Sequence, residues 1–266
     1  MFKHILVDIQ KQVGTITIHR PEVRNALNYA TLQELEQAVD MLNAQEEIRI
    51  IVITGSGEKA FVSGADINEL NDRKALDCLK PGMQGVYKKI EDSDKVTLAV
   101  INGHALGGGC ELALACDLRI AVDHARIGLP ELNLAIIPGA GGTQRLSRMI
   151  GKSRALEMIL LGKLITGEEA KSIGLVAQSC PFSQLIKEKE DMIQTLLSKG
   201  PLALKLTKMI VHRGYDSDID TAFMLEKLAQ SIAFSTEDKT EGINAFLEKR
   251  SPAYDRDVNT QNESEV

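Results

Sequence analysis

The stretch NGHALGGGCELALACD, residues 102–117, joins three consecutive glycines to a run that is otherwise suited to a helix. The glycines, Gly107–Gly109, stand just before Glu111, an acid in the first turn of that predicted helix. A glycine inside a helix is unfavourable by about 1 kcal/mol relative to alanine, so three together indicate a requirement on the backbone. The requirement is either close packing of the helix against a strand or exposure of main-chain N–H groups to a ligand.

Apolar runs on both sides of this stretch predict buried strands. They cover residues 48–55 (IRIIVITG), 96–103 (VTLAVING) and 117–122 (DLRIAV). Near-continuous apolar runs are typical of parallel strands that are buried on both faces. Because helical patterns lie between them, the first half of the chain is predicted to form an α/β layered core.

The amino-terminal segment is predicted to be a β-hairpin followed by a helix. Residues 5–9 and 13–19 alternate apolar and polar side chains, and Gly14 is placed in the hairpin turn. Thr31 is expected to cap the next helix, with Glu34 three residues later as its capping-box partner.

After Gly139 the pattern changes to successive helices, apart from a short strand near 175–179. Glycines and one proline separate these helices, as is common at helix ends. The predicted helices are 141–150, 152–161, 166–173, 182–198, 201–213, 218–234 and 236–248. The last residues, 255–266, are polar and are predicted to be a disordered tail.

The composition is that of an ordinary globular protein, with 266 residues, 44% apolar and 26% charged. Lys and Arg number 31 against 37 Asp and Glu, and no basic stripe stands out, so nucleic acid is not expected as a partner. The four cysteines form no CxxC pair, and no metal site is predicted. No apolar run reaches the ~18 residues of a membrane span and no signal peptide is recognised, so a cytoplasmic protein without a membrane partner is expected.

The glycine-rich segments do not match nucleotide-binding motifs. A phosphate loop would need glycine at position 146, where Leu146 stands, and no GxGxxG sequence is present. The first turn of a helix still offers unpaired N–H donors and the positive end of the helix dipole. Such donors can stabilise an oxygen that becomes negative during a reaction, which is an oxyanion hole.

A second stretch, FVSGADINEL at 61–70, repeats the design of strand, glycine, small residue and helix start. Asp66 by itself fits a helix N-cap. Glu131, after Pro130, fits the first turn of a short helix, where a glutamate is often merely solvated. Glu111 allows the same interpretation, but both acids are surrounded by small and apolar residues, where a carboxylate is unfavourable unless it has a use.

Taken together, several long segments resemble the enoyl-CoA hydratase/isomerase (crotonase) superfamily, hydratase type. They are HRPEVRNALN (19–28), FVSGADI (61–67), NGHALGGGCELALACDLRIA (102–121), GLPELNLAIIPGAGGTQRL (128–146), ITGEEAKSIGLV (165–176) and STEDKTEGINAFLEKR (235–250). The resemblance implies an α/β crotonase fold: a spiral of repeated strand–strand–helix turns over 1–198, then a helical carboxyl-terminal region over 199–254. It also implies that this region builds homotrimers, which commonly pair into hexamers.

The resemblance assigns the site as follows. The main-chain N–H groups of Ala65 and Gly108 would bind the thioester carbonyl oxygen, and Glu111 and Glu131 would flank a bound water. The acyl-CoA contacts would come from Ala65, Asp66, Ile67, Asn68, Gly108, Arg24 and Ala26. Relatives often have a charged residue at the position of Asn68. No cofactor is expected, since coenzyme A is part of the substrate.

The implied activity is that of a hydro-lyase: syn addition of water to a 2-enoyl-CoA thioester, giving 3-hydroxyacyl-CoA. Three alternatives stay open. The chain resembles methylglutaconyl-CoA hydratases over NLAIIPGAGGTQRL, residues 133–146. A Δ3-Δ2 enoyl-CoA isomerase of the same superfamily would often keep only the acid at Glu131, so the presence of both acids favours hydration. An RNA-binding or scaffold role is disfavoured by the acidic composition.

Overall fold

The computed structural model describes residues 2–254, and the predicted tail at 255–266 lies outside the described residues. Internal contacts divide the chain into two compact units, residues 1–191 and 192–266. The first unit holds the sheets, and the second holds the carboxyl-terminal helices.

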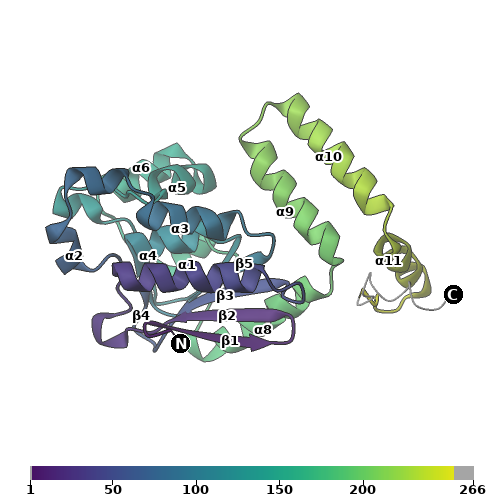
Figure 1. Cartoon of the computed structure of the whole chain (residues 1–266), viewed down its shortest axis with the longest axis horizontal. Coiled ribbons are helices and arrows are strands. Elements are labelled where there is room, and N and C mark those ends of the chain that lie inside the picture. The colour runs from purple at the N-terminus through teal and green to yellow at the C-terminus, as the bar shows by residue number, and fades with distance from the viewer. Residues whose placement is uncertain (1, 255–266) are drawn as a thin grey trace. The chain divides into compact units, whose positions relative to one another are not determined.

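Within the described part of the first unit, the strands form two sheets. The larger has the order β1-β2-β3-β5-β7-β10 and is parallel except for the β1–β2 hairpin. Its strands are β1 (Ile5–Gln10), β2 (Val13–Ile18), β3 (Ile50–Gly55), β5 (Val96–Ile101), β7 (Leu118–Val122) and β10 (Gln178–Cys180), of which Figure 1 labels the first four. The smaller has the order β4-β6-β8-β9, with strands Ala60–Val62, His104–Leu106, Arg126–Gly128 and Ile165–Thr166.

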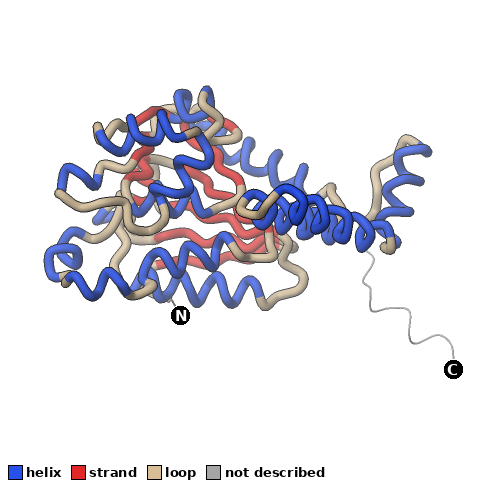
Figure 2. Tube along the Cα trace, turned by 90° about the horizontal axis from the view of Figure 1, so that it is seen from above, coloured by secondary structure: helices blue, strands red, loops and turns tan. Residues whose placement is uncertain are grey.

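Helices enclose these strands, as Figure 2 shows in blue around red. The α-helices of the first unit are α1 (Tyr29–Asn43), α2 (Ile67–Asp72), α3 (Gly82–Glu91), α4 (Gly108–Ala115), α5 (Gly142–Ile150), α6 (Lys152–Leu160), α7 (Gly167–Ser172) and the greater part of α8 (Leu185–Leu197). The 3-10 helices are η1 (Pro21–Val23), η2 (Ala75–Leu79), η3 (Glu131–Leu134) and η4 (Phe182–Gln184). The expected α/β class with a helical carboxyl-terminal region is confirmed, and the predicted buried strands are β3, β5 and β7.

The predicted turn of the amino-terminal hairpin is wrong. The chain reverses at Lys11 and Gln12, with Lys11 at φ 53°, while Gly14 lies inside β2 opposite Ile9. A Cβ at Gly14 would stand 2.6 Å from the Leu42 Cδ2 atom of α1. Gly14 is therefore needed for close packing of α1 on the sheet.

The predicted cap of α1 is wrong as well. Asn28 is the N-cap, and its Oδ1 accepts hydrogen bonds from the backbone N–H and the hydroxyl of Thr31. Glu34 makes no capping box, because its carboxylate accepts from the backbone N–H groups of Lys3 and His4. Asparagine and threonine both suit an N-cap, so the residue type alone did not decide between them.

The helix of the glycine-rich stretch, α4, packs directly against β4. A Cβ at Gly109 would stand 2.0 Å from the Val62 carbonyl oxygen, a distance that no side chain tolerates. All residues of α4 are buried. One of the three glycines thus serves close packing, which was the first of the two interpretations of this stretch.

The second unit contains three complete helices among its described residues: α9 (Pro201–Tyr215), α10 (Ile219–Phe234) and α11 (Glu237–Glu248). Asp218 and Thr236 cap α10 and α11 by accepting from Thr221 and Lys239. Many large apolar side chains on these helices are exposed, among them Phe223, Ile232, Phe246 and Leu247. Over residues 2–254, none of the helices combines the length and the apolar character that spanning a membrane requires.

Candidate active site

Three segments that carry the predicted site residues follow neighbouring strands of the smaller sheet. β4, β6 and β8 are parallel, so their carboxyl ends lie along the same edge of the sheet. Ala65 follows β4, Gly108 follows β6, and Glu131 follows β8. In parallel sheets the ends of adjacent strands are where ligand-binding groups gather.

The main-chain amides of Ala65 and Gly108 lie close together. A Cβ at Gly108 would stand 3.7 Å from the Ala65 nitrogen. Ala65 forms a β-bridge with Leu27, but the residues on either side of Ala65 make its hydrogen bonds. The Leu27 N–H donates to the Gly64 carbonyl, and the Asp66 N–H donates to the Leu27 carbonyl. Across residues 2–254, neither the Ala65 nor the Gly108 amide donates to a protein acceptor. Two free N–H donors side by side are what an oxyanion hole requires.

Glu111 is buried, with 2% of its surface exposed, and projects from the first turns of α4. Its Oε1 accepts hydrogen bonds from the main-chain N–H groups of Ala140, at 2.7 Å, and Gly142, at 2.8 Å. Burial raises the pKa of the carboxyl above its ordinary value, and these two hydrogen bonds and the charge of Arg145 offset only part of that rise. Donors that favour the ionised form suit a carboxylate that acts as a base.

Glu131 is in a different environment. Both of its carboxylate oxygens are buried without a hydrogen-bond partner among the described residues. Burial, and then the charge of Glu111, raise its pKa from 4.5 to about 7. Gly107, at φ 52°, leaves space for this side chain, because a Cβ there would stand 3.2 Å from Glu131 Oε1. Two carboxyls with different environments can serve as an acid and a base at one pH.

The expected acyl-CoA contacts lie on two segments that pair with each other. Ser63 N–H donates to the Arg24 carbonyl, which ties the loop after η1 to the segment before α2. Arg24 is exposed at φ 55°, whereas Ala26 is buried and its carbonyl accepts from Arg20. The two segments thus bring Arg24 and Ala26 beside the residues around Ala65.

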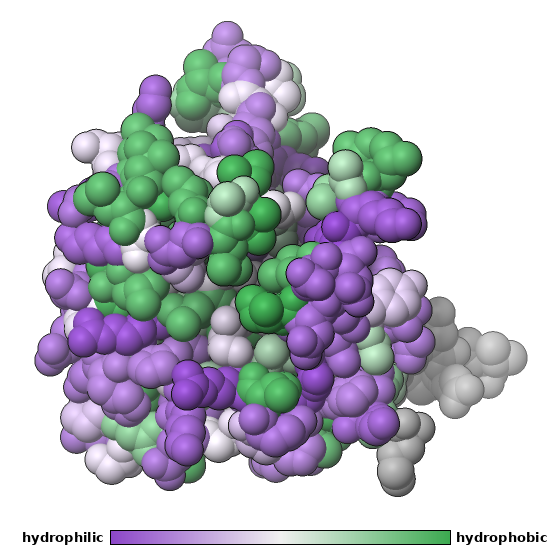
Figure 3. All heavy atoms as spheres, turned by 90° about the vertical axis from the view of Figure 1, so that its left-hand side faces the viewer, coloured by the Kyte–Doolittle hydropathy of each residue, from purple (hydrophilic) through white to green (hydrophobic). Residues whose placement is uncertain are grey.

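Asp66 is the N-cap of α2, as predicted, and accepts from the Asn68 N–H. Its carboxylate also pairs with Arg20 at 3.2 Å, a contact that sequence reasoning did not foresee. Ile67 and Asn68 are exposed in the first turn of α2. Figure 1 places α2 at its left edge, and Figure 3, which views that side, shows apolar surface there between polar groups.

Three further side chains near the site were missed from the sequence. The Tyr87 hydroxyl donates to the Gly108 carbonyl at 2.7 Å, and Tyr87 is fully buried. Arg145 donates to the Ala140 carbonyl at 2.9 Å and to both oxygens of Glu91. Tyr87, Glu91 and Arg145 come from segments far from Gly108 or from each other in sequence, so no local pattern indicated these contacts.

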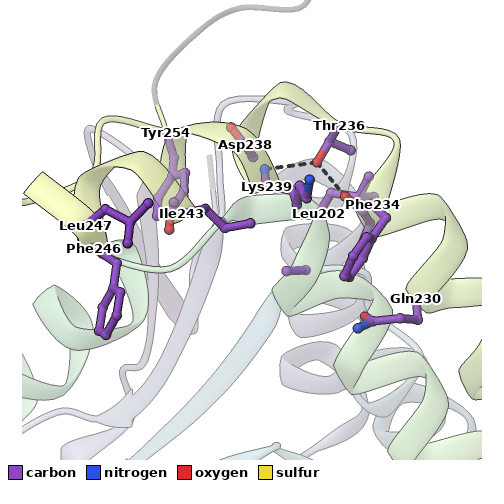
Figure 4. Close-up of a pocket in the computed structure, with 14 residues that line it drawn as sticks. Leu202, Gln230, Phe234, Thr236, Asp238, Lys239, Ile243, Phe246, Leu247 and Tyr254 are labelled. Carbon is purple, nitrogen blue, oxygen red and sulfur yellow. Dashed lines mark hydrogen bonds between the residues drawn. The ribbon is translucent and has the colours of Figure 1, made fainter.

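A cavity of about 360 Å³ lies among the helices of the second unit, and none of the predicted site residues lines it. Phe234, Ile243, Phe246 and Leu247 give it an apolar wall (Figure 4). Tyr254 closes against α11, where a Cβ at Gly242 would stand 2.8 Å from its hydroxyl. Over the described part of the chain, no group of three or more His, Cys, Asp or Glu residues is arranged to hold a metal ion.

The chain is similar to known proteins over almost its whole length. A family model described as Enoyl-CoA hydratase/isomerase matches residues 8–257. The short-chain-enoyl-CoA hydratase of Clostridium acetobutylicum is 41% identical over 93% of this chain and 95% of its own. The crotonyl-CoA hydratase of Syntrophomonas wolfei is 41% identical over 94% and 96%. The crystal structure of an enoyl-CoA hydratase from Bacillus anthracis superposes with a TM-score of 0.91 at 40% identity, covering 95% of this chain and 99% of that one. The chain therefore belongs to the enoyl-CoA hydratase/isomerase family.

Proposed function

We propose that this protein is a hydro-lyase that adds water to short-chain 2-enoyl-CoA thioesters and forms 3-hydroxyacyl-CoA. The observation that carries the proposal is the Glu131 carboxyl, buried without a partner and with a pKa of about 7. Glu131 lies at the same edge of the smaller sheet as the two unpaired main-chain amides of Ala65 and Gly108. The relatives named as short-chain and crotonyl-CoA hydratases support the same reaction.

The two amides stabilise the charge that develops on the thioester oxygen. When water attacks Cβ, the electrons of the double bond move toward the carbonyl, which takes on enolate character. N–H donors already in place for that oxygen favour the transition state over the substrate, and losing one such donor typically costs about 3 kcal/mol. Glycine at position 108 leaves this approach open, because any side chain there would stand beside the Ala65 nitrogen.

The two acids have separate roles in the proposed reaction. Glu111, whose Oε1 accepts from two N–H donors that favour its carboxylate form, takes a proton from the attacking water. Glu131, whose carboxyl has no such donors, is protonated near neutral pH and delivers its proton to Cα. The step forms one C–O and one C–H bond and consumes the double bond. One proton passing from Glu111 back to Glu131 through solvent then restores the starting state.

The preference for short acyl chains is supported by Met83 of α3 as well as by the relatives. The Met83 Sδ atom would stand 3.0 Å from a Cβ at Gly108, so this side chain occupies space next to the oxyanion donor. Methylglutaconyl-CoA, a branched alternative, would have to fit the same space. The isomerase alternative requires only one proton-shuttling acid, whereas this site has two.

The adenine and phosphates of coenzyme A are proposed to dock near Arg24, Ala26 and residues 65–68, without a resident cofactor or metal ion. Arg24 is exposed and cationic on that paired segment. Asp66 Oδ2 is paired with Arg20, which limits its charge repulsion toward a phosphate. A cytoplasmic location stays a prediction, which fractionation of the source cells tests.

Self-association into trimers, and of trimers into hexamers, is proposed for the helices of the second unit. Their exposed apolar side chains support it, since such a surface is unfavourable in water unless it is covered. These side chains are Met209, Val211, Tyr215, Ile219, Phe223, Met224, Leu228, Ile232, Phe234, Ile243, Phe246 and Leu247. An RNA-binding role has no comparable support.

The test is the loss of enoyl thioester absorbance when the protein is mixed with crotonyl-CoA. Glu111→Gln and Glu131→Gln are each expected to lower kcat by on the order of 10²–10⁴-fold, with little change in KM. Glu168→Gln, an exposed first-turn glutamate of α7, is the control and should behave as the wild type. Turnover near the wild-type rate in either site variant contradicts the paired-acid reaction.

A substrate panel separates the remaining alternatives. Crotonyl-, hexenoyl-, decenoyl- and 3-methylglutaconyl-CoA assayed together should give the highest kcat/KM for crotonyl-CoA. Faster turnover of the branched thioester would reassign the substrate. Conversion of a 3-enoyl-CoA without hydration would reassign the reaction to isomerisation.

A further inference from the structure

The turn that holds Glu111 is itself held by an ion pair on its other side. Arg145 of α5 donates through Nη1 to the Ala140 carbonyl at 2.9 Å, and the Ala140 N–H donates to Glu111 at 2.7 Å. A single residue of the turn is thus bonded on one face to Arg145 and on the other to the catalytic carboxylate.

Arg145 is fixed in turn by Glu91, the last residue of α3. Its Nε and Nη2 atoms donate to the two carboxylate oxygens of Glu91 at 2.9 and 3.1 Å. Only 11% of the Arg145 side chain and 22% of the Glu91 side chain are exposed. A two-point contact between a guanidinium and a carboxylate defines the orientation of both groups, which a lysine could not do.

Two glycines allow the turn at 140–142 to pass between the Arg145 guanidinium and the Glu111 carboxylate. A Cβ at Gly141, which has φ 101°, would stand 2.2 Å from Arg145 Nη1. A Cβ at Gly142 would stand 2.9 Å from Glu111 Oε1. The main chain at 140–142 is therefore in close contact with the cation on one side and with the carboxylate on the other.

We propose that Arg145, anchored by Glu91, is a positioning residue that fixes the turn at 140–142 and thereby keeps Glu111 in place and favours its carboxylate form. Arg145 acts in two ways. Its hydrogen bond to Ala140 aims two N–H donors at Glu111, and its positive charge favours the carboxylate form. This inference rests on the proposed hydratase reaction, in which Glu111 is the base.

Other ionisable groups also face Glu111 and must be kept constant in a test. Burial first, and the Glu111 charge in addition, raise the pKa values of Glu131 of η3, Tyr87 of α3 and Cys110 of α4. Of the strands packed on α4, β4 has no ionisable residue, and the histidine of β6 stands at the strand end opposite α4. Arg145 is the cation whose charge acts to lower the pKa of Glu111. A second arginine, Arg119 of β7, donates to the Ala113 carbonyl further along α4 and is unchanged in the test.

The test compares kcat/KM for crotonyl-CoA across pH in Arg145→Met, Arg145→Lys and Glu91→Gln. Loss of Arg145 raises the pKa of Glu111, so the acidic limb of the profile, where the base becomes ionised, moves to higher pH. At the acidic end, Arg145→Met is expected to lose on the order of tenfold more kcat/KM than it loses at its optimum. Arg145→Lys keeps the positive charge, so the acidic limb of its profile should lie at the wild-type pH, while its kcat should stay below the wild-type value. Glu91→Gln keeps the arginine charge, so kcat should fall without a movement of the limb to higher pH.

Arg148→Met, one turn further along α5, is the matched control, since Arg148 bonds Gln144 on the exposed side of the same helix. It should retain the wild-type profile. Circular dichroism establishes that each variant is folded; if Arg145→Met is not, Arg145→Lys and Glu91→Gln carry the test through kcat. A folded Arg145→Met with the wild-type limb, or Glu91→Gln with wild-type kcat, overturns the inference. A wild type without turnover would instead reject the proposed function, so the two failures are distinguishable.

Discussion

The carboxyl of Glu131 has opposite effects on stability and on function. Its pKa is about 7 in the folded protein against an ordinary value of 4.5, because burial and the Glu111 charge disfavour ionisation. The folded state therefore binds this proton more tightly than the unfolded chain does. As pH rises from about 4.5 to 7, this group lowers the free energy of unfolding by up to about 3 kcal/mol, less where water reaches the carboxyl.

The change in unfolding free energy caused by Glu131→Gln is accordingly expected to be more favourable at pH 8 than at pH 5. Glutamine cannot ionise, so the pH-dependent loss of stability disappears. Urea unfolding of both proteins at the two pH values measures the difference. An equal change in unfolding free energy at pH 5 and pH 8 would show that Glu131 does not titrate in this range.

The same proton predicts the pH dependence of the reaction. Hydration needs protonated Glu131, so kcat/KM for crotonyl-CoA should fall as pH rises through about 7. Dehydration of 3-hydroxybutyryl-CoA should follow the same profile, because the reaction has no net proton change and the ratio of the two kcat/KM values equals a pH-independent equilibrium constant. A kcat/KM for crotonyl-CoA that stays constant as pH rises through about 7 would argue against Glu131 as the proton donor.

At the scale of elements, two adjacent glycines of α4 have different roles: Gly109 serves packing, and Gly108 has the proposed role of oxyanion donor. Gly109→Ala is expected to prevent α4 from seating on β4, because the new Cβ would stand 2.0 Å from a main-chain oxygen of Val62. The new Cβ of Gly108→Ala would stand 3.0 Å from the flexible Met83 side chain and 3.7 Å from the Ala65 nitrogen, so this variant should fold. It should nevertheless lose activity, since its methyl group stands beside the Ala65 amide.

Thermal unfolding and kcat/KM of the two alanine variants distinguish these effects. Gly109→Ala should lower the melting temperature or abolish soluble expression, whereas Gly108→Ala should change the melting temperature little. Gly139→Ala, whose new Cβ would meet only Ile137 at 3.8 Å, is the control for both. Identical melting temperatures for the 108 and 109 variants would contradict this division.

The helix α3 connects the parts of the site. Met83, Tyr87 and Glu91 are spaced four residues apart, which places them on one face of the helix. Met83 lies against Gly108, Tyr87 bonds the Gly108 carbonyl, and Glu91 anchors Arg145. One face of a single helix thus supports both the proposed oxyanion donor, Gly108, and the turn that holds the proposed base, Glu111.

The sequence was sufficient for features that local pattern determines. The apolar runs predicted the buried strands β3, β5 and β7, because parallel strands buried on both faces are almost continuously apolar. The roles expected of Gly108 and Glu131 came from the resemblance to the crotonase superfamily, since β6 and β8, which precede them, were not predicted. It was insufficient where tertiary packing decides. Gly14 was assigned to a turn, although Leu42 of a distant helix requires it. Glu91 and Arg145 are 54 residues apart, and no spacing rule relates them.

At the scale of the whole molecule, the proposed self-association through the exposed apolar side chains of the second unit can be tested directly. Phe246→Glu is expected to reduce the molecular mass in solution, because a charge at this 83% exposed aromatic position opposes burial in an interface. Asn244→Glu on the same helix is the matched control and should retain the wild-type mass. Light scattering after size exclusion measures both, and an unchanged mass for Phe246→Glu would place the interface elsewhere.

The unpaired carboxyl of Glu131 also makes ligand binding a proton-coupled event. An acyl chain that excludes water from this group raises its pKa further, so near pH 7 the protein should take up a fraction of a proton from the buffer on binding. Titration calorimetry with a non-reactive acyl-CoA, repeated in buffers of different ionisation enthalpy, should then give buffer-dependent heats. In Glu131→Gln those heats should become equal. The affinity for such a ligand is therefore expected to weaken as the medium becomes more alkaline, even though neither partner changes shape.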